Sequence, residues 1–293
     1  MSGTTGTITP NRQQALARSS ATDTTITVAG VTTALLQAGD GPPMVLLHGP
    51  GEFGGTWLPV LDDLATTHRV IAPDLPGHGA SNAPAGGLDH ASLIVWLDEL
   101  IAATCPVPPV LVGRVVGGAI AAEFAAGHPD RVSELVLVDT MGLAPFEPEP
   151  RFGLALHRFL GDPNQSSYER FMDFCAFDLD RARDRFGDRW QPFSGYAVEL
   201  ARDPRVQAAT GAMIGLYGAQ PLPPELLTSI SVPTTLIWGR QDAAIALGVA
   251  EAAAERYGWP LLVVDDAGDD PPLDRPREFL EALHGALGSR GRS

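Results

Sequence analysis

The chain contains no lysine, because all 20 of its basic residues are arginines. This absence excludes Schiff-base chemistry and a lysine general base. Cysteine is almost as scarce, since only Cys105 and Cys175 occur, far apart and outside any metal-ligand spacing. We therefore expect two packed thiols in a reducing cytoplasm. Phosphate-binding loops, dinucleotide fingerprints and metal-ligand clusters are also missing from the sequence, so we expect no cofactor and no metal.

Long hydrophobic runs are absent too. No apolar stretch approaches the ~18 residues of a membrane helix. Residues 1–22 are polar and have no apolar stretch behind their arginines, unlike a secretion signal. We expect a cytoplasmic protein that makes no contact with membranes, with residues 1–22 as a flexible N-terminal tail and residues 289–293 as a C-terminal tail.

Basic residues are fewer than acidic ones, and the formal net charge is −15. This balance argues against a nucleic-acid partner, because neutralising phosphates requires a basic surface. The expected partner is therefore a small-molecule substrate. Whether the chain is a monomer or a homodimer is left open by the sequence.

The apolar pattern that is present predicts short strands alternating with helices. Residues 24–28 and 32–37 are rich in β-formers and meet at Ala29-Gly30, which indicates a hairpin. Further strands are predicted at 44–47, 70–72, 110–112, 135–138, 235–238 and 261–264. Helices are predicted at 57–66, 91–103, 117–126, 246–257 and 276–287. Such alternation is typical of a parallel sheet covered on both faces, with the active site at the carboxyl ends of the strands.

One long interruption breaks this rhythm. Residues 142–224 contain no convincing strand but several helix signals, including Ser166-Ser167-Tyr168-Glu169, a capping-box pattern that opens a helix. An insertion of this kind between two sheet strands predicts a helical cap over the active-site edge. The core would then comprise residues 23–141 and 225–288.

Five motifs follow predicted strands. They are His48-Gly49-Pro50-Gly51, DLPGHGAS at 74–81, GRVVGG at 113–118, WGRQD at 238–242 and AGDDPPL at 267–273. In this order they resemble the oxyanion loop, the turn after the next strand, the nucleophile elbow, the acid loop and the histidine loop of the α/β-hydrolase fold. The resemblance spans about residues 24–287. It implies an α/β protein with a mostly parallel eight-stranded sheet, helices on both faces and a helical cap.

The tip of the elbow motif is Val115. In the hydrolytic members of the family that this chain resembles, a serine, cysteine or aspartate stands there and attacks an electrophilic carbon. Valine has neither a lone pair nor an acidic proton, and its neighbours Arg114 and Val116 are no better suited. Since no other serine lies in a Gly-x-Ser-x-Gly frame, we predict that no covalent intermediate forms.

The other two triad positions that the resemblance implies both carry aspartate. Asp269 occupies the place of the family's histidine, and Asp242 occupies the place of its acid. His48 and His78 lie in motifs with structural roles in the family. The remaining histidines are predicted on solvent or helix surfaces: His68, His90, His128, His157 and His284.

Two further substitutions bear on the elbow region. Pro50 stands where the resemblance implies a backbone N–H that helps to bind an oxyanion, and proline has none, although Gly51 could substitute. The elbow also normally holds its nucleophile in a strained conformation that a β-branched residue tolerates badly. We therefore predict a relaxed or compensated turn at Val115.

These residues favour acid–base chemistry. If the loops keep their family positions, Asp242 and Asp269 face each other near the pocket floor, and repulsion would leave one of them protonated. Arg114 could keep the other ionised. This gives an acid and a base without a covalent intermediate, suited to epoxide opening, cyclisation, dehydration or isomerisation. His48, Gly49, Pro50, Gly51, Val115 and Val116 would shape the pocket and oxyanion region.

Two alternatives remain open at this point. The aspartates could be solvated remnants in a protein that only binds a ligand, or Asp could activate a water for direct hydrolysis. The predicted cap is rich in aromatic residues, which suits a flat or polycyclic ligand. Together with the lysine-free, Ala-, Gly- and Arg-rich composition, this resembles a bacterial tailoring enzyme of secondary metabolism. The aromatic and apolar cap residues are Phe146, Phe152, Leu156, Phe159, Phe171, Met172, Phe174, Phe177, Trp190 and Phe193.

Overall fold

The computed structural model describes residues 9–288. The predicted C-terminal tail, 289–293, and residues 1–8 of the predicted N-terminal tail lie outside this range. Among residues 9–288, no helix has both the length and the apolar character that crossing a membrane requires.

An eight-stranded sheet forms the centre of the molecule, and it confirms the predicted mostly parallel arrangement. The strands run in the order β1-β2-β4-β3-β5-β6-β7-β8. Strands β3 to β8 are parallel to one another, whereas β1 and β2 form an antiparallel hairpin that pairs antiparallel with β4. The strands are β1 (Thr22–Val28), β2 (Val31–Ala38), β3 (Pro43–Leu47), β4 (Arg69–Pro73), β5 (Val110–Arg114), β6 (Glu134–Val138), β7 (Thr234–Gly239) and β8 (Leu261–Val264).

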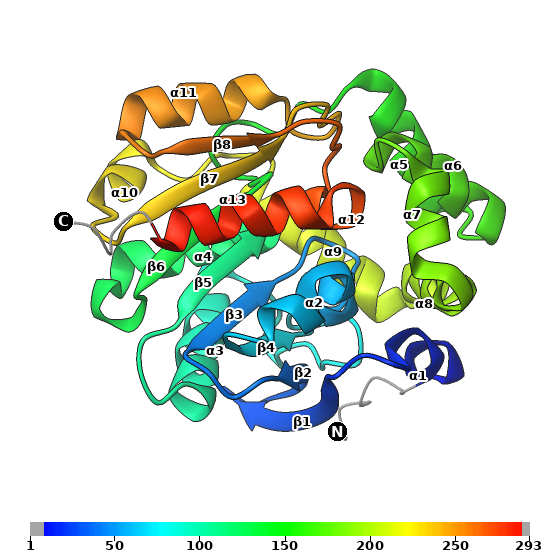
Figure 1. The fold of residues 1–293 in the computed structure, drawn as a ribbon, viewed down its shortest axis with the longest axis horizontal. Coiled ribbons are helices and arrows are strands. Elements are labelled where there is room, and N and C mark those ends of the chain that lie inside the picture. The colour runs from blue at the N-terminus through cyan, green and yellow to red at the C-terminus, as the bar shows by residue number, and fades with distance from the viewer. Residues whose placement is uncertain (1–8, 289–293) are drawn as a thin grey trace.

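Helices cover both faces of the sheet, as predicted (Figure 1). On one face α3 (His90–Thr104), α4 (Val116–Gly127) and α11 (Leu247–Tyr257) pack against alternate strand residues such as Leu111 and Leu135. On the other face α2 (Leu58–Leu64) and α13 (Pro276–Gly288) pack against the intervening residues such as Val112 and Val136. This alternation follows from the period of two in a strand. Shorter helices are η1 (Gly54–Trp57), η2 (Pro129–Arg131), α10 (Pro224–Ser229) and α12 (Pro271–Asp274).

The predicted cap region holds helices and, among its described residues, no strand. Figure 1 shows α5 to α8 beside the sheet, with α9 leading back toward it. One local prediction needs correction: the capping box of α6 is formed by Asn164 and Ser167, two residues earlier than the expected Ser166 and Glu169. The helices are α5 (Pro150–Gly161), α6 (Gln165–Cys175), α7 (Leu179–Phe186), η3 (Gly187–Arg189), α8 (Trp190–Arg202) and α9 (Pro204–Tyr217).

The structure differs from the prediction of a tail over residues 1–22. Residues 10–16 form helix α1 (Pro10–Leu16), which packs against α8, and β1 begins at Thr22. The Arg12 side chain is fully buried and binds both Asp23 and Asp74. Polar composition alone suggested a tail, because the sequence does not reveal that this arginine has buried carboxylate partners.

Candidate functional site

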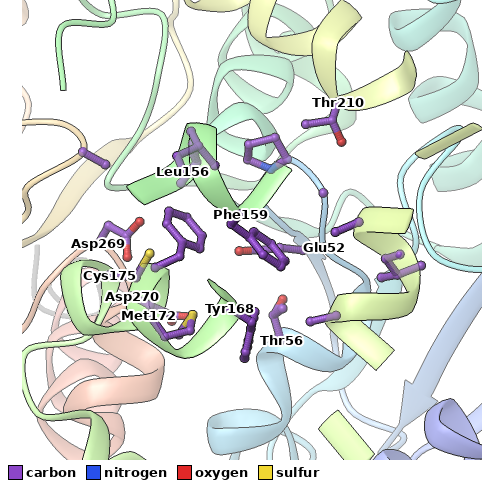
Figure 2. Close-up of a pocket in the computed structure, with 18 of the residues that line it drawn as sticks. Glu52, Thr56, Leu156, Phe159, Tyr168, Met172, Cys175, Thr210, Asp269 and Asp270 are labelled. Atoms are coloured by element: carbon purple, nitrogen blue, oxygen red, sulfur yellow. The ribbon is translucent and has the colours of Figure 1, made fainter. Parts of the chain in front are cut away.

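A pocket lies between the cap and the carboxyl ends of the parallel strands, where such folds place their ligands. Its volume of about 140 Å³ is similar to the ~150 Å³ cavity that holds benzene in an engineered protein. Figure 2 shows Asp269 next to Cys175, with Glu52 across the pocket in this view. Of the residues predicted for the site, the pocket wall includes Pro50, Gly51, Arg114, Val115 and Asp269.

Val115 occupies the turn between β5 and α4 with φ 51° and ψ −115°. The prediction of a relaxed turn is therefore wrong. The surroundings enforce this conformation, because the Val115 N–H donates to the Val138 carbonyl at 3.2 Å and its own carbonyl accepts from Met141 at 3.1 Å. At Gly117, a Cβ would lie 2.5 Å from the Leu47 carbonyl oxygen. These hydrogen bonds and the close packing of the strand-to-helix turn stabilise the conformation by more than the ~1–3 kcal/mol that the strained backbone costs.

Asp269 lies in the loop after β8 and is 8% exposed. Its N–H donates to the carbonyl of Cys175 at the end of α6, at 3.1 Å. The neighbouring Gly268 permits this approach, since a Cβ there would lie 2.0 Å from the same carbonyl. The Oδ1 atom of Asp269 is buried and has no hydrogen-bond partner. A buried polar atom without a partner is costly, so this loop holds an unsatisfied carboxyl oxygen at the pocket wall.

Two more buried aspartates stand behind Asp269, at the ends of neighbouring strands. Asp242 follows β7, and its Oδ1 accepts the N–H groups of Ala244 and Ile245 at 2.7 and 2.8 Å. Asp139 follows β6 with φ 42°, and its Oδ1 accepts the Gly239 N–H at 2.9 Å. In each aspartate the Oδ2 atom is buried and bonds to no other residue, but a proton on Asp139 would bond to Asp242, and this bond lowers the pKa of Asp242. We call Asp139, Asp242 and Asp269 the acid cluster.

Burial makes the acid cluster hold protons. Burial raises the pKa of Asp242 to about 7, although the two backbone N–H groups oppose this shift. Burial, reinforced by the negative charge of Asp242, raises the pKa of both Asp139 and Asp269 well above the ordinary value. The repulsion expected between Asp242 and Asp269 is thus present, with Asp139 as a third member. Asp242 and Asp139 do not line the pocket, so Asp269 alone links the cluster to it.

Replacing Asp242 by asparagine should stabilise the fold at alkaline pH. A carboxyl with a raised folded-state pKa contributes stability that is present below pH ~4 and is lost as the pH rises through about 7. At ~1.4 kcal/mol per pKa unit, the shift of the Asp242 pKa from 3.8 to about 7 lowers the free energy of unfolding at pH 8 by at most about 4 kcal/mol. The amide in Asp242→Asn keeps an oxygen for Ala244 and Ile245 and removes the charge.

Thermal unfolding checks this expectation. The melting temperature of Asp242→Asn should exceed that of the unmodified protein by about 5 °C at pH 8 and by a smaller margin at pH 5, with the difference vanishing below about pH 4. Asp265→Asn, at an exposed position, is the control and should change neither value. An equal melting temperature for Asp242→Asn and the unmodified protein at pH 8 would show that Asp242 carries no buried-charge cost.

Arg114 has other partners than the sequence predicted. Its guanidinium forms a salt bridge with Glu52 at 2.5 Å and a longer one with Asp270 at 3.5 Å. It reaches Asp269 by donating to the backbone carbonyl at 3.1 Å. The charge of Arg114 lowers the pKa of both Asp242 and Asp269, in the direction predicted, but burial outweighs it. Its direct side-chain partners are Glu52 and Asp270. Burial raises the pKa of Asp270 to about 7, and Arg114 opposes this shift.

Of the remaining residues predicted for the oxyanion region, some line the pocket and others are buried in the core. Pro50 and Gly51 line the pocket, whereas Val116 is buried in the core against the sheet. His48 is also buried, and burial lowers its pKa to about 4. Its neutral ring donates from Nδ1 to the Gly49 carbonyl at 2.7 Å and accepts the Leu75 N–H at Nε2, at 2.9 Å. The structural role expected for His48 is confirmed by these bonds.

The helix that begins at Val116 adds a positive end to this site. An N–H in the first turn of a helix has no helical carbonyl to bind, and the helix dipole adds about half a positive charge there. The start of α4 follows Val115 directly, so a developing negative charge near Val115 would meet this favourable potential.

The upper wall of the pocket is supplied by the cap. Seven of the ten cap residues singled out from the sequence line it: Phe146, Phe152, Leu156, Phe159, Phe171, Met172 and Phe193. Phe174, Phe177 and Trp190 do not, and Phe177 is exposed. The wall also holds polar groups that the sequence analysis missed, including Thr56, Tyr168 and Thr210. The aromatic wall and few polar groups suit a largely apolar ligand.

Sequence reasoning missed Asp139, Glu52 and Asp270. Each had a signal, because Asp139 directly follows a predicted strand, Glu52 directly follows the oxyanion-like motif, and Asp270 is part of the last motif. Cys175 also lines the pocket, and burial raises its pKa well above the ordinary value, which leaves an unreactive thiol. Within residues 9–288, no group of three or more His, Cys, Asp or Glu side chains could hold a metal ion.

Comparisons with known proteins agree with this architecture. A family model described as the alpha/beta hydrolase fold matches residues 42–276. The chain is 31% identical over 259 residues to a pimeloyl-[acyl-carrier protein] methyl ester esterase of Aeromonas hydrophila subsp. hydrophila, covering 85% of this chain and 97% of that protein. It is 30% identical over 245 residues to a 2-hydroxymuconate semialdehyde hydrolase of Pseudomonas sp. (strain CF600), covering 78% and 81%.

A solved structure gives the same result for the fold. The 2-hydroxy-6-oxo-6-phenylhexa-2,4-dienoate hydrolase from Rhodococcus sp. strain RHA1 superimposes with a TM-score of 0.76 and 24% identity, covering 91% of this chain and all of that one. The relatives in sequence are enzymes of the hydrolase type.

Proposed function

This chain belongs to the alpha/beta hydrolase fold family, and on that premise we propose that it is an acid–base enzyme without a covalent intermediate. Asp269 moves a proton on a small, largely apolar or aromatic molecule held under the cap. Suitable reactions are epoxide opening, intramolecular cyclisation, dehydration and isomerisation, as in the tailoring of a secondary metabolite.

The observation that carries this proposal is the pairing of Val115 with Asp269. Both line the same pocket, and the backbone at Val115 has the positive φ of a tip that presents its side chain to a ligand. That side chain is a hydrocarbon and cannot attack a substrate. The carboxyl group of Asp269, in contrast, belongs to a residue that lines the pocket, and it can give or take a proton.

The environments of Asp269 and Glu52 favour different roles. The raised pKa of Asp269 suits a general acid that holds a proton at neutral pH. Glu52 also lines the pocket, where it forms a salt bridge with Arg114 and accepts the Gly49 N–H at 2.9 Å. These two contacts favour a carboxylate that stabilises positive charge on the ligand. Two carboxyl groups held in opposite states are a known basis for acid–base catalysis.

Hydrolysis by an Asp269-activated water is the second candidate. It is favoured by the hydrolase chemistry of the relatives in sequence. It needs the same carboxyl in its ionised form, so the two candidates differ in pH dependence: acid catalysis by Asp269 fails as the pH rises through its pKa, whereas water activation fails as the pH falls through it.

Covalent labelling tests the absence of a nucleophile at position 115. A serine-directed fluorophosphonate should leave the unmodified protein unlabelled, and p-nitrophenyl acetate should give no burst. The double variant Val115→Ser, Asp269→His should be labelled, because the introduced imidazole could take the serine proton and the free Oδ2 of Asp242 could accept the ring N–H. The single variant Val115→Ser is the matched control and should label far more slowly.

Stoichiometric labelling of the unmodified protein would contradict the proposal. Product formation from styrene oxide and p-nitrophenyl acetate, a two-compound panel followed by mass spectrometry, then separates the candidates. Opening of the epoxide to the diol supports acid–base chemistry, and steady hydrolysis of the ester without labelling supports the water mechanism. Binding of both without any product would instead assign a ligand-binding role.

A further inference from the structure

The outer face of the cap carries a groove between α5 and α6 that is separate from the pocket. Its volume is about 570 Å³. Three arginines edge it, and an apolar strip of Leu154 and Phe174 lies between them. The full lining is Arg151, Leu154, Ala155, Arg158, Asp162, Asn164, Ser167, Arg170, Asp173 and Phe174.

The three arginines have no partner among the described residues. Neither an ion pair nor a hydrogen bond joins the guanidinium of Arg151, Arg158 or Arg170 to any of residues 9–288, and all three side chains are exposed. The formal net charge of the chain is −15, so acidic partners are plentiful. The lining also holds Asp162 and Asp173, so three positive groups stand against two negative ones and the groove is net positive. A net positive groove with unpaired arginines in so acidic a protein is an electrostatic match for a negatively charged ligand.

The spacing of these arginines fits a helical ligand better than a single anion. Arg151 and Arg158 are seven residues apart on α5, which places them on one face about 10 Å apart. Leu154 lies between them along the helix and is 50% exposed. A lone phosphate is bound by convergent donors, whereas the two arginines start about 10 Å apart along α5. Carboxylates two turns apart on a helix, with an apolar residue between them, would match both arginines and Leu154.

We propose that this groove docks an acidic amphipathic helix of a partner protein. Arg151, Arg158 and Arg170 pair with its carboxylates, and Leu154 and Phe174 receive an apolar side chain. Exposed ion pairs are each worth only ~0.2–1 kcal/mol, so the contact is weak and sensitive to salt. The other face of α5 carries Phe152, Leu156 and Phe159 into the pocket wall, so the partner would sit directly behind the ligand. The proposal does not depend on the reaction at Asp269.

A fluorescent 15-residue helical peptide tests the proposal on the full chain. The peptide carries glutamates at positions 1, 8 and 12 and leucines at 4 and 11; its control has glutamine in place of each glutamate. We expect weak binding of the first peptide only, with a dissociation constant of about 0.1–1 mM, weakened about tenfold or more between about 50 mM and about 500 mM NaCl. The triple variant Arg151→Glu, Arg158→Glu, Arg170→Glu should lose binding by at least about tenfold.

A matched triple variant carries the same charge change elsewhere. Arg18→Glu, Arg256→Glu and Arg277→Glu lie outside the groove and should leave binding unchanged. Arg158→Glu and Leu154→Ser, each alone, repeat the test with less perturbation of the cap. Equal binding to the groove triple and the unmodified protein, or no peptide binding at all, would overturn the proposal. Groove-dependent binding of inorganic phosphate or of phosphatidylglycerol vesicles, without peptide binding, would also overturn it.

Discussion

Replacement of Asp269 with asparagine is expected to lower the rate on a substrate from the panel by about 10²–10⁴-fold, the usual contribution of a general acid or base. The amide has nearly the same shape, and the N–H of residue 269 still binds the Cys175 carbonyl. The melting temperature at pH 5 should therefore not fall below that of the unmodified protein. A rate loss without a loss of stability would assign the effect to proton transfer.

The pH profile adds a second readout. If Asp269 is the acid, the rate is constant at low pH and falls as the pH rises through the raised pKa of this group. Asp242→Asn removes a negative charge behind Asp269, which should lower that pKa and shift the fall to lower pH. Asp266→Asn, in the same loop and half exposed, is the control and should keep both rate and profile. Full activity in both Asp269→Asn and Asp242→Asn would rule out the proposed chemistry.

Much of the fold was predictable because its determinants are local. The short apolar strands, the Ala29-Gly30 turn and the Gly-rich loops each leave a signal within a few residues, and all eight predicted strands are present with boundaries shifted by three residues or fewer. The number of strands and their mostly parallel arrangement followed from the resemblance, whereas the order of the strands was not predicted. Alternating strands and helices predict a parallel sheet, but they do not say which strands are neighbours.

The backbone at Val115 could not be predicted from the preferences of valine. Those preferences amount to a few kcal/mol at most, whereas the turn is fixed by the hydrogen bonds to Val138 and Met141 and by close packing at Gly117. Tertiary contacts therefore impose on Val115 a strained backbone conformation that valine alone does not favour.

The acid cluster was predictable only in part. Asp242 and Asp269 lie in motifs, but Asp139 became visible only when β6 and β7 were seen side by side, with Asp139 bound to Gly239. The partners of Arg114 are long-range as well, because Glu52 and Asp270 lie 62 and 156 positions away in the sequence. Side-chain pairs of this separation leave no local pattern, and the same limitation produced the incorrect expectation for the N-terminal segment.

Arg12→Ala should destabilise the fold by about 3–5 kcal/mol, the usual cost of removing one partner of a buried ion pair. The Arg12 side chain has no exposed surface, and its Nη1 lies 2.7 Å from Oδ2 of Asp74, which is itself fully buried. Two N–H groups also bind Asp74, from Gly54 and Ala80, but they cannot neutralise its charge. Removal of the guanidinium would leave that carboxylate buried and unpaired.

The effect should extend to the cap, because α1 joins the sheet to α8. Thr9 and Asn11 each donate to the Glu199 carboxylate at 2.7 Å, while Arg12 holds Asp23 and Asp74 of the core. Arg12→Ala should therefore lower the melting temperature by roughly 10 °C and increase hydrogen exchange in α8 as well as in α1.

Arg18→Ala is the matched control, since its guanidinium is 78% exposed and lies 3.9 Å from an exposed carboxylate; a change within about 0.5 kcal/mol is expected. Arg12→Met combined with Asp74→Asn removes both charges and should recover part of the loss. If Arg12→Ala melted like Arg18→Ala, the ion pairs of Arg12 would contribute nothing measurable to stability. If the double variant were no better than Arg12→Ala, the loss would come from packing and not from the buried charge of Asp74.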